Sequence, residues 1–283
     1  MSSTAPILID VLSSDSFAAE HLPGAVNFCV YETAFIEKMK AAYTDRQTPI
    51  TVYGLSELTK EAETALVRLQ EAGYAQVNTL PGGLDGWKAR GGTVEGNGEA
   101  ASQSSASHEI DVAASSISWT GSNLFNFHTG SLQLASGRVH FSHGVLQAGS
   151  FVVDMTSLRC ADLTDKGLNA MLIAHLRSDD FFSVDAFPTA EFVIVSVEKL
   201  DVTPGLPNYR ITGDFTLRGT TNPLEIVATV SERPDGGYVA QSFFDLDRTL
   251  WGSLYGSGKF FSRLGQHVVN DQIHFHLKLV TKG

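Results

Sequence analysis

The hydrophobic pattern of this chain changes once, and the change divides the chain into two parts. Up to about residue 90, short apolar runs at residues 7–11 and 50–53 alternate with helical spacing at residues 34–43 and 57–70. This alternation predicts a parallel sheet with flanking helices. Beyond residue 108, apolar and polar residues alternate with a period of two, which is typical of antiparallel strands with one buried face. The sequence therefore predicts two domains of different fold class.

A segment of small and polar residues separates the two patterns. Residues 91–107 read GGTVEGNGEAASQSSAS, which offers too little apolar surface to offset the entropy of ordering a chain. We therefore expect a first domain at residues 1–95, a flexible linker at 96–107 and a second domain at 108–283. The second domain should contain one helix, because five residues fall on a single helical stripe. These residues are Leu168, Met171, Leu172, His175 and Leu176.

Charge and cysteine content exclude several classes of function. The chain has 20 Lys and Arg against 31 Asp and Glu, a net charge of −11 that opposes binding to nucleic acid. Cys29 and Cys160 lie far apart, so neither a disulfide framework nor a Cys-x-x-Cys metal site is predicted. No apolar run approaches the roughly 20 residues of a membrane helix, and no leader pattern precedes residue 7. We expect a cytoplasmic protein without a transmembrane segment.

Four motifs in the first 95 residues resemble the rhodanese family. They are LIDV at 8–11, EHLPGAVNF at 20–28, ITVYG at 50–54 and PGGLDGW at 81–87. The resemblance implies an α/β domain in which a strand ends in a cysteine that carries a persulfide, followed by four variable residues and an arginine. Here Gly54 stands at the cysteine position and Thr59 at the arginine position.

Glycine has no side chain to hold a persulfide, so we expect this domain to be catalytically silent. The degenerate loop comprises Gly54, Leu55, Ser56, Glu57, Leu58 and Thr59. No histidine lies near Ser56, which we expect to cap the following helix. We expect Cys29 to be a buried structural thiol. The domain would serve as a docking, dimerisation or anion-sensing module; the alternative is an enzyme related to sulfurtransferases, or a protein that handles sulfur through a partner's cysteine.

The second domain resembles the YceI-like family over essentially its whole length. The matching stretches are VDMTSL at 153–158, HLRSDDFFSVDAFPTAEF at 175–192, ITGDFTLRGTTNP at 211–223, DRTLWGSLYGS at 247–257 and VNDQIHFHLKL at 269–279. The resemblance implies a lipocalin-like antiparallel barrel of eight strands. It also implies binding of a polyisoprenoid, an isoprenoid quinone or a related long-chain lipid.

The physics of a small barrel agrees with such a ligand. Eight strands enclose a space that is either filled by side chains or able to hold one slender molecule. Each buried CH₂ group contributes about 0.8 kcal/mol, so an isoprenoid tail suits such a space. The competing interpretation is an interior filled by the protein's own aromatic rings. The residues expected to line the site are Phe151, Val153, Leu176, Phe181, Phe182, Phe192, Ile211, Phe215, Leu217, Ile226, Trp251, Tyr255 and Phe275.

Polar residues of the second domain do not form a recognisable catalytic set. His175 lies on the helical stripe, where a hydrogen-bonded core histidine is expected. His274 and His276 alternate with apolar residues and should point to solvent, so no metal site is predicted. Arg218 and Arg248 flank turns near the mouth, where either an exposed ion pair or a contact with a ligand headgroup is expected.

The sequence thus predicts a binding or carrier protein that needs no cofactor and has no catalytic residues. Its ligand would be an apolar long-chain molecule in the barrel. A protein partner or a second copy of the chain would bind through the first domain.

Overall fold

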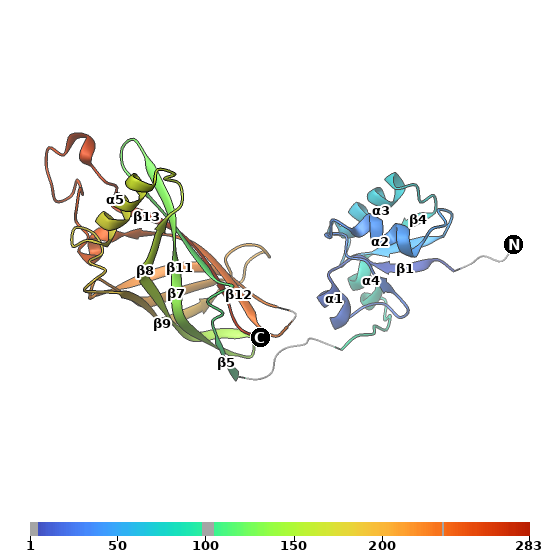
Figure 1. The fold of residues 1–283 in the computed structure, drawn as a ribbon. Helices are drawn as coiled ribbons and strands as arrows, with labels where there is room; N and C mark the ends of the chain where they lie inside the picture. Colours follow the sequence, from blue (N-terminus) through green and yellow to red (C-terminus); the bar gives the residue numbers. More distant parts are fainter. Residues whose placement is uncertain (1–4, 98–104, 234) are drawn as a thin grey trace. The chain divides into compact units, whose positions relative to one another are not determined.

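The computed structural model describes residues 5–97, 105–233 and 235–283. The chain divides into two compact units, residues 1–101 and 102–283, and each is described by itself (Figure 1). The first unit is an α/β sandwich and the second an antiparallel barrel. The predicted change of fold class within the chain is therefore confirmed.

The first unit is built on a four-stranded parallel sheet with the strand order β2-β1-β3-β4. The strands are β1 (Ile7–Asp10), β2 (Val26–Asn27), β3 (Ile50–Tyr53) and β4 (Val77–Thr79). The helices are α1 (Ser14–Ala19), α2 (Phe35–Ala42), α3 (Glu61–Glu71) and α4 (Gly83–Ala89). The main core joins the sheet to α2 and α3, which lie on one face, while α1 and α4 lie on the other (Figure 1).

The second unit is a closed barrel of eight strands. They are β6 (Ser116–Ser122), β7 (Phe127–Ser142), β8 (Val145–Cys160), β9 (Thr189–Lys199), β10 (Tyr209–Leu217), β11 (Thr220–Glu232), β12 (Tyr238–Asp247) and β13 (Gln272–Val280). Pairing between β7 and β8 closes the ring, and a further strand, β5 (Ser105–Glu109), pairs with the second half of β7. The single predicted helix is α5 (Lys166–Arg177).

Alternation of side chains along each strand separates the barrel interior from solvent. On β10, Tyr209 and Ile211 are buried whereas Arg210 is exposed. Gly213 is required by a close approach, since a Cβ there would lie 2.4 Å from the ring of Phe192. The register between β9 and β10 shifts at this point, so the phenyl ring of one strand occupies the space that the glycine leaves free.

The two ends of the barrel differ in their connections. The loops β6–β7, β8–β9, β10–β11 and β12–β13 meet at one end, here called the open end, together with α5 (Figure 1). Three contacts tie these segments together: His128 with Asp162, the backbone bridge between Asn123 and Val269, and the ring contact of His175 with Tyr255. The remaining connections, with β5 and the end of β13, form the closed end.

The predicted linker is partly wrong. Glu95 pairs with His21, and the Asn97 N–H donates to the Ala18 carbonyl at 2.9 Å, so both residues belong to the first unit. Residues 105–107 lie in β5 and pair with β7. The prediction missed this strand because strand pairing uses backbone groups, which a composition of small polar residues does not reveal. Residues 98–104 lie outside the described part of the chain. Within that described part, no helix has the length and apolar character needed to cross a membrane.

Candidate functional site

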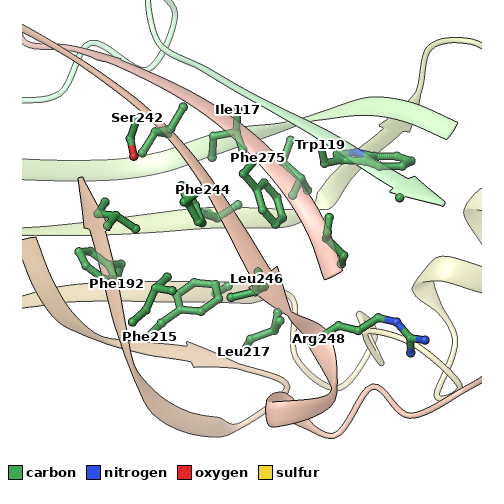
Figure 2. A pocket seen from close by; sticks show the side chains of 18 of the residues that line it. Ile117, Trp119, Phe192, Phe215, Leu217, Ser242, Phe244, Leu246, Arg248 and Phe275 are labelled. Atoms are coloured by element: carbon green, nitrogen blue, oxygen red, sulfur yellow. The ribbon is translucent and has the colours of Figure 1, made fainter. Parts of the chain in front are cut away.

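The barrel encloses a cavity of about 460 Å³, within the range of about 300–1,000 Å³ that small-molecule sites occupy. Apolar side chains from all eight strands line it, and Figure 2 shows four phenyl rings that do so from different strands. These rings belong to Phe192, Phe215, Phe244 and Phe275. Every side chain predicted to contact the ligand lines this cavity, with the exception of Trp251. The interior is therefore not filled by its own aromatic rings.

Trp251 packs behind the cavity wall, so its predicted place in the site is wrong. It ends the 3₁₀ helix η1 (Arg248–Trp251) and is only 1% exposed. Its indole Nε1 donates to the Phe215 carbonyl at 2.8 Å, and its ring meets the Phe215 ring edge-on at 5.4 Å. Strand alternation could not place Trp251, because β12 ends at Asp247 and Trp251 lies in the 3₁₀ helix that follows.

Aromatic residues narrow the closed end of the cavity. The rings of Phe141 and Tyr238 stack at a centroid distance of 3.5 Å, and His108 meets Tyr238 edge-on at 5.2 Å. The Tyr209 hydroxyl accepts a hydrogen bond from the Leu146 N–H at 3.4 Å. All of these residues except His108 and Tyr209 also line the cavity.

The open end is more polar. The polar side chains that line the cavity there include Ser122, Asn123, Asn126, His128, His175, Arg248, Gln266, His267 and Asn270. From α5, Leu172 and Leu176 face the cavity, whereas Leu168 and Met171 are 55% and 70% exposed. The single apolar stripe predicted for this helix is therefore wrong, because the helix lies at the rim with one side toward solvent.

His175 is a rim residue rather than the expected core histidine. Its side chain is 37% exposed, and its Nε2 lies 3.3 Å from the Asp180 carboxylate. The ring meets those of Phe181 and Tyr255 edge-on, with centroids 5.0 and 4.6 Å away. His175 thus combines an apolar contact surface with a polar atom at the mouth.

Two arginines hold the loops of the open end. Arg248 is 1% exposed and donates to the carbonyls of Asn270, Ser253 and Val269 at 3.1, 2.6 and 3.1 Å. The prediction of an exposed ion pair is wrong for this residue. Its guanidinium is buried and donates hydrogen bonds to three loop carbonyls instead of to water. Arg218 donates to three further carbonyls, those of Phe181, Gly252 and Asp179.

One buried polar group of the cavity wall lacks a partner. Trp119 lines the cavity on β6, is 6% exposed, and its Nε1 makes no hydrogen bond among the described residues. The buried hydroxyl of Ser242, also in the wall, donates to the Val227 carbonyl at 2.7 Å. A buried donor without an acceptor costs about 1–3 kcal/mol.

A group of three potential metal ligands lies at the open end and was not anticipated from the sequence. His128 Nδ1 is 2.9 Å from Asp162 Oδ2, and Cys160 Sγ donates to Asp162 Oδ1 at 3.3 Å. Desolvation opposes ionisation of Asp162, but hydrogen bonds from His128, Thr129 and Cys160 outweigh it and lower the pKa to about 2. No local spacing could have revealed this group, because His128 comes from another strand.

The other histidine pair points away from the cavity. His274 lies on the outer face of β13 with its Nδ1 2.5 Å from Asp245 Oδ1, and His276 stacks on the exposed ring of Phe243. Neither histidine lines the cavity. They do not form a group of three metal ligands with neighbours in the described part of the chain.

In the first unit, the loop after β3 folds as a turn rather than as a helix cap. Ser56 Oγ accepts from the Leu58 N–H at 3.2 Å, and Thr59 Oγ1 donates to the Ser56 carbonyl at 3.0 Å. Helix α3 begins at Glu61 after Lys60, so the expected capping role of Ser56 is wrong. The Ser56 side chain bonds within the turn at residues 56–59, and α3 begins only after this turn.

Glu61 occupies the space beside Gly54. A Cβ atom at Gly54 would lie 3.0 Å from both Cβ and Oε2 of Glu61. That carboxylate oxygen is buried and has no hydrogen-bond partner among the described residues. A carboxylate in this position disfavours a neighbouring anion such as a thiolate. Cys29 is partly buried and free.

Comparison with known families agrees with both folds. A YceI-like domain matches residues 108–281 and a rhodanese-like domain matches residues 1–90. The chain belongs to the YceI-like family. It is 35% identical over 141 residues to a UPF0312 protein of Shewanella denitrificans, covering 48% of this chain and 69% of that one. Other curated relatives, such as one from Photorhabdus laumondii, are covered over about a third of their length (33%).

Two solved structures resemble the barrel of this YceI-like protein. BcnA of Burkholderia cenocepacia is 20% identical with a TM-score of 0.48, covering 61% of this chain and 99% of that one. A domain from Saccharophagus degradans, described as polyisoprenoid-binding, is 11% identical with a TM-score of 0.44, covering 62% of this chain and 98% of that one.

Proposed function

We propose that this YceI-like protein binds and carries an apolar long-chain lipid, a polyisoprenoid or an isoprenoid quinone, in its barrel. The observation that carries the proposal is the cavity: apolar along the strands, narrowed by stacked aromatic rings at one end and polar at the other. This arrangement matches an amphiphile whose tail lies in the barrel and whose headgroup lies at the open end. No cofactor is needed for such a function.

The apolar contacts are sufficient for useful affinity. Each buried CH₂ contributes about 0.8 kcal/mol, so a five-carbon isoprene unit offers roughly 3–4 kcal/mol. Micromolar binding corresponds to about 8 kcal/mol. Two or three units therefore reach it after the cost of ordering the ligand is subtracted.

A quinone-type headgroup suits the polar features of the wall. The N–H of Trp119 is buried without an acceptor, and a carbonyl oxygen on the ligand would supply one. The amides of Asn123, Asn126 and Asn270 at the open end offer both donors and acceptors. A saturated hydrocarbon would leave the Trp119 N–H unpaired.

The open end also carries exposed apolar side chains from three separate segments. Exposed apolar side chains near the mouth of an apolar cavity favour exchange of the ligand with a lipid surface. The residues are Leu124, Phe125, Phe127, Leu168, Met171, Leu250, Tyr255, Phe260 and Phe261.

For the rhodanese-like domain we propose a non-catalytic role as a docking module for a protein partner. Gly54 supplies no nucleophile, and the neighbouring Glu61 carboxylate disfavours both a thiolate and a bound anion. The anion-sensing role is therefore the least favoured of the three roles considered from the sequence. We propose no sulfurtransferase activity for this chain.

Lipid binding is tested by extracting the purified full chain and analysing the extract by mass spectrometry, followed by titration with isoprenoid quinones of increasing tail length. The decisive variant is Ala228→Phe, which fills part of the cavity from β11. The matched control is Val227→Phe, on the outer face of the same strand. We expect Ala228→Phe to lower affinity for long tails at least about tenfold. Equal affinity in both variants, or no binding by the unmodified protein, would refute the proposal.

A further inference from the structure

The side chains of His128, Cys160 and Asp162 bring three different donor atoms together at the open end of the barrel. Their ligand atoms all lie within 4.8 Å of one another. His128 is the second residue of β7, Cys160 is the last residue of β8, and Asp162 follows in the loop toward α5. The group thus combines an imidazole nitrogen, a thiol sulfur and a carboxylate oxygen.

The backbone holds this group in place. Cys160 pairs with Gly130 across the β7–β8 ladder, and the Ala161 N–H donates to the Thr129 carbonyl at 2.8 Å. In return, the Thr129 N–H donates to Asp162 Oδ1 at 2.7 Å. The Asn169 amide of α5 donates to the Cys160 carbonyl at 3.1 Å. These bonds fix the three side chains before any ion binds, which lowers the entropic cost of binding.

The spacing suits a tetrahedral ion. With zinc bonds of about 2.0–2.3 Å to nitrogen, oxygen and sulfur, neighbouring ligand atoms lie about 3.3–3.6 Å apart. Here the distances are 2.9 Å between His128 Nδ1 and Asp162 Oδ2 and 3.3 Å between Cys160 Sγ and Asp162 Oδ1. Small side-chain rotations therefore suffice to place one ion among the three groups.

We propose that His128, Cys160 and Asp162 form a binding site for a zinc-like divalent transition metal ion. Mixed nitrogen, sulfur and oxygen donors favour Zn²⁺ over the hard ions Mg²⁺ and Ca²⁺, which take oxygen ligands. Three protein ligands leave the fourth position open, as in zinc sites that bind water or a further ligand. Since His128 also lines the cavity, the ion would lie at its rim.

Two simpler interpretations account for the geometry less well. A plain His–Asp ion pair exists elsewhere, between His274 and Asp245, but no thiol accompanies it. A reactive cysteine needs a base or a cation to form its thiolate, whereas Cys160 donates to a carboxylate. The cluster therefore fits a metal site better than a nucleophile or a surface ion pair.

The site is tested by titrating untagged full-length protein with Co²⁺ and then displacing it with Zn²⁺. We expect one ion per chain, a thiolate-to-Co²⁺ charge-transfer band and d–d bands of tetrahedral intensity. Cys160→Ser should abolish the charge-transfer band, and both Cys160→Ser and His128→Ala should weaken Zn²⁺ binding at least about tenfold.

Two variants serve as matched controls. Cys29→Ser removes the other cysteine, and His274→Ala breaks a His–Asp pair on the outer face of the barrel, so neither should change affinity or spectrum. Circular dichroism and thermal unfolding report whether each variant folds, independently of the metal and of the lipid. Absence of the charge-transfer band in the unmodified protein, or its loss in Cys29→Ser with retention in Cys160→Ser, would overturn the proposal. Because lipid binding is measured separately, failure of one proposal leaves the other intact.

Discussion

The loop after β3 and the interior of the barrel differ in whether neighbouring side chains fill the available space. Beside Gly54, the flexible side chain of Glu61 moves into the space. In the barrel, a ring of hydrogen-bonded strands holds the walls apart, and a cavity of about 460 Å³ remains. One neighbouring side chain can close a gap at a turn, whereas a closed ladder fixes the diameter of a barrel. The loop beside Gly54 therefore leaves no open space next to its backbone, whereas the barrel does.

The strongest test of the barrel side of this comparison is Arg248→Ala. Removal of the guanidinium leaves the carbonyls of Asn270, Ser253 and Val269 without this donor, and Asp271, 3.6 Å away, keeps only its pair with Lys259. We expect the free energy of unfolding of the barrel to fall by about 3–5 kcal/mol in urea. The control Arg210→Ala breaks exposed pairs with Glu198 and Glu225 and should cost less than about 1 kcal/mol. Similar losses in both would show that Arg248 does not hold the open end.

The effect of Glu61 on the loop after β3 is tested by introducing a thiol at position 54. We expect Gly54→Cys alone to form no persulfide with thiosulfate, because the Glu61 carboxylate opposes the thiolate. Adding Glu61→Ala should lower the thiol pKa by about one unit and raise its alkylation rate at neutral pH about tenfold. The measurements are iodoacetamide kinetics and the mass of the sulfur adduct, in a background where Cys29 and Cys160 are replaced by Ser. Equal reactivity of the two variants would contradict this account.

The polar feature of the cavity is tested by Trp119→Phe, which removes the indole N–H and keeps an aromatic wall. Loss of one hydrogen bond of about 0.5–1.5 kcal/mol should weaken quinone binding about three- to tenfold. Binding of a hydrocarbon with the same tail should not weaken. Trp251→Phe is the matched control: its N–H serves the Phe215 carbonyl, so stability should fall while the quinone-to-hydrocarbon preference stays constant.

The smallest effect concerns pH. Burial of Asp247 opposes its ionisation, but hydrogen bonds from Lys259 and Thr249 outweigh burial and hold the pKa below its ordinary value of 3.8. A folded-state pKa below the unfolded value stabilises the fold above pH 3.8, and this contribution disappears as the pH falls toward the folded-state pKa. Asp247→Asn should therefore cost about 1 kcal/mol at pH 7 and flatten the acid limb of the stability curve. The control is Asp214→Asn at an exposed position, which should cost less stability at pH 7 than Asp247→Asn.

Patterns along the chain predicted part of the cavity wall correctly. Alternation placed Phe151, Ile211 and Phe215 on the inner face, and the structure agrees. The method failed where the chain leaves the strands: Trp251 in η1, the two sides of α5, and Ser56 in its turn. Periodicity shows which residues of one strand or helix lie on the same face. It does not show where a loop or a short helix lies, because contacts with distant segments decide that position.

Sequence alone determined the two fold classes, their order along the chain and the absence of a cysteine at position 54, since all three depend on residue identity and local spacing. Only the tertiary structure decided that the barrel is hollow, that Arg248 is buried, that Glu61 fills the space beside Gly54, and that His128 meets Cys160 and Asp162. The physical reason is that each of these depends on how distant segments pack against one another, and packing volume and long-range register are not written in any local pattern.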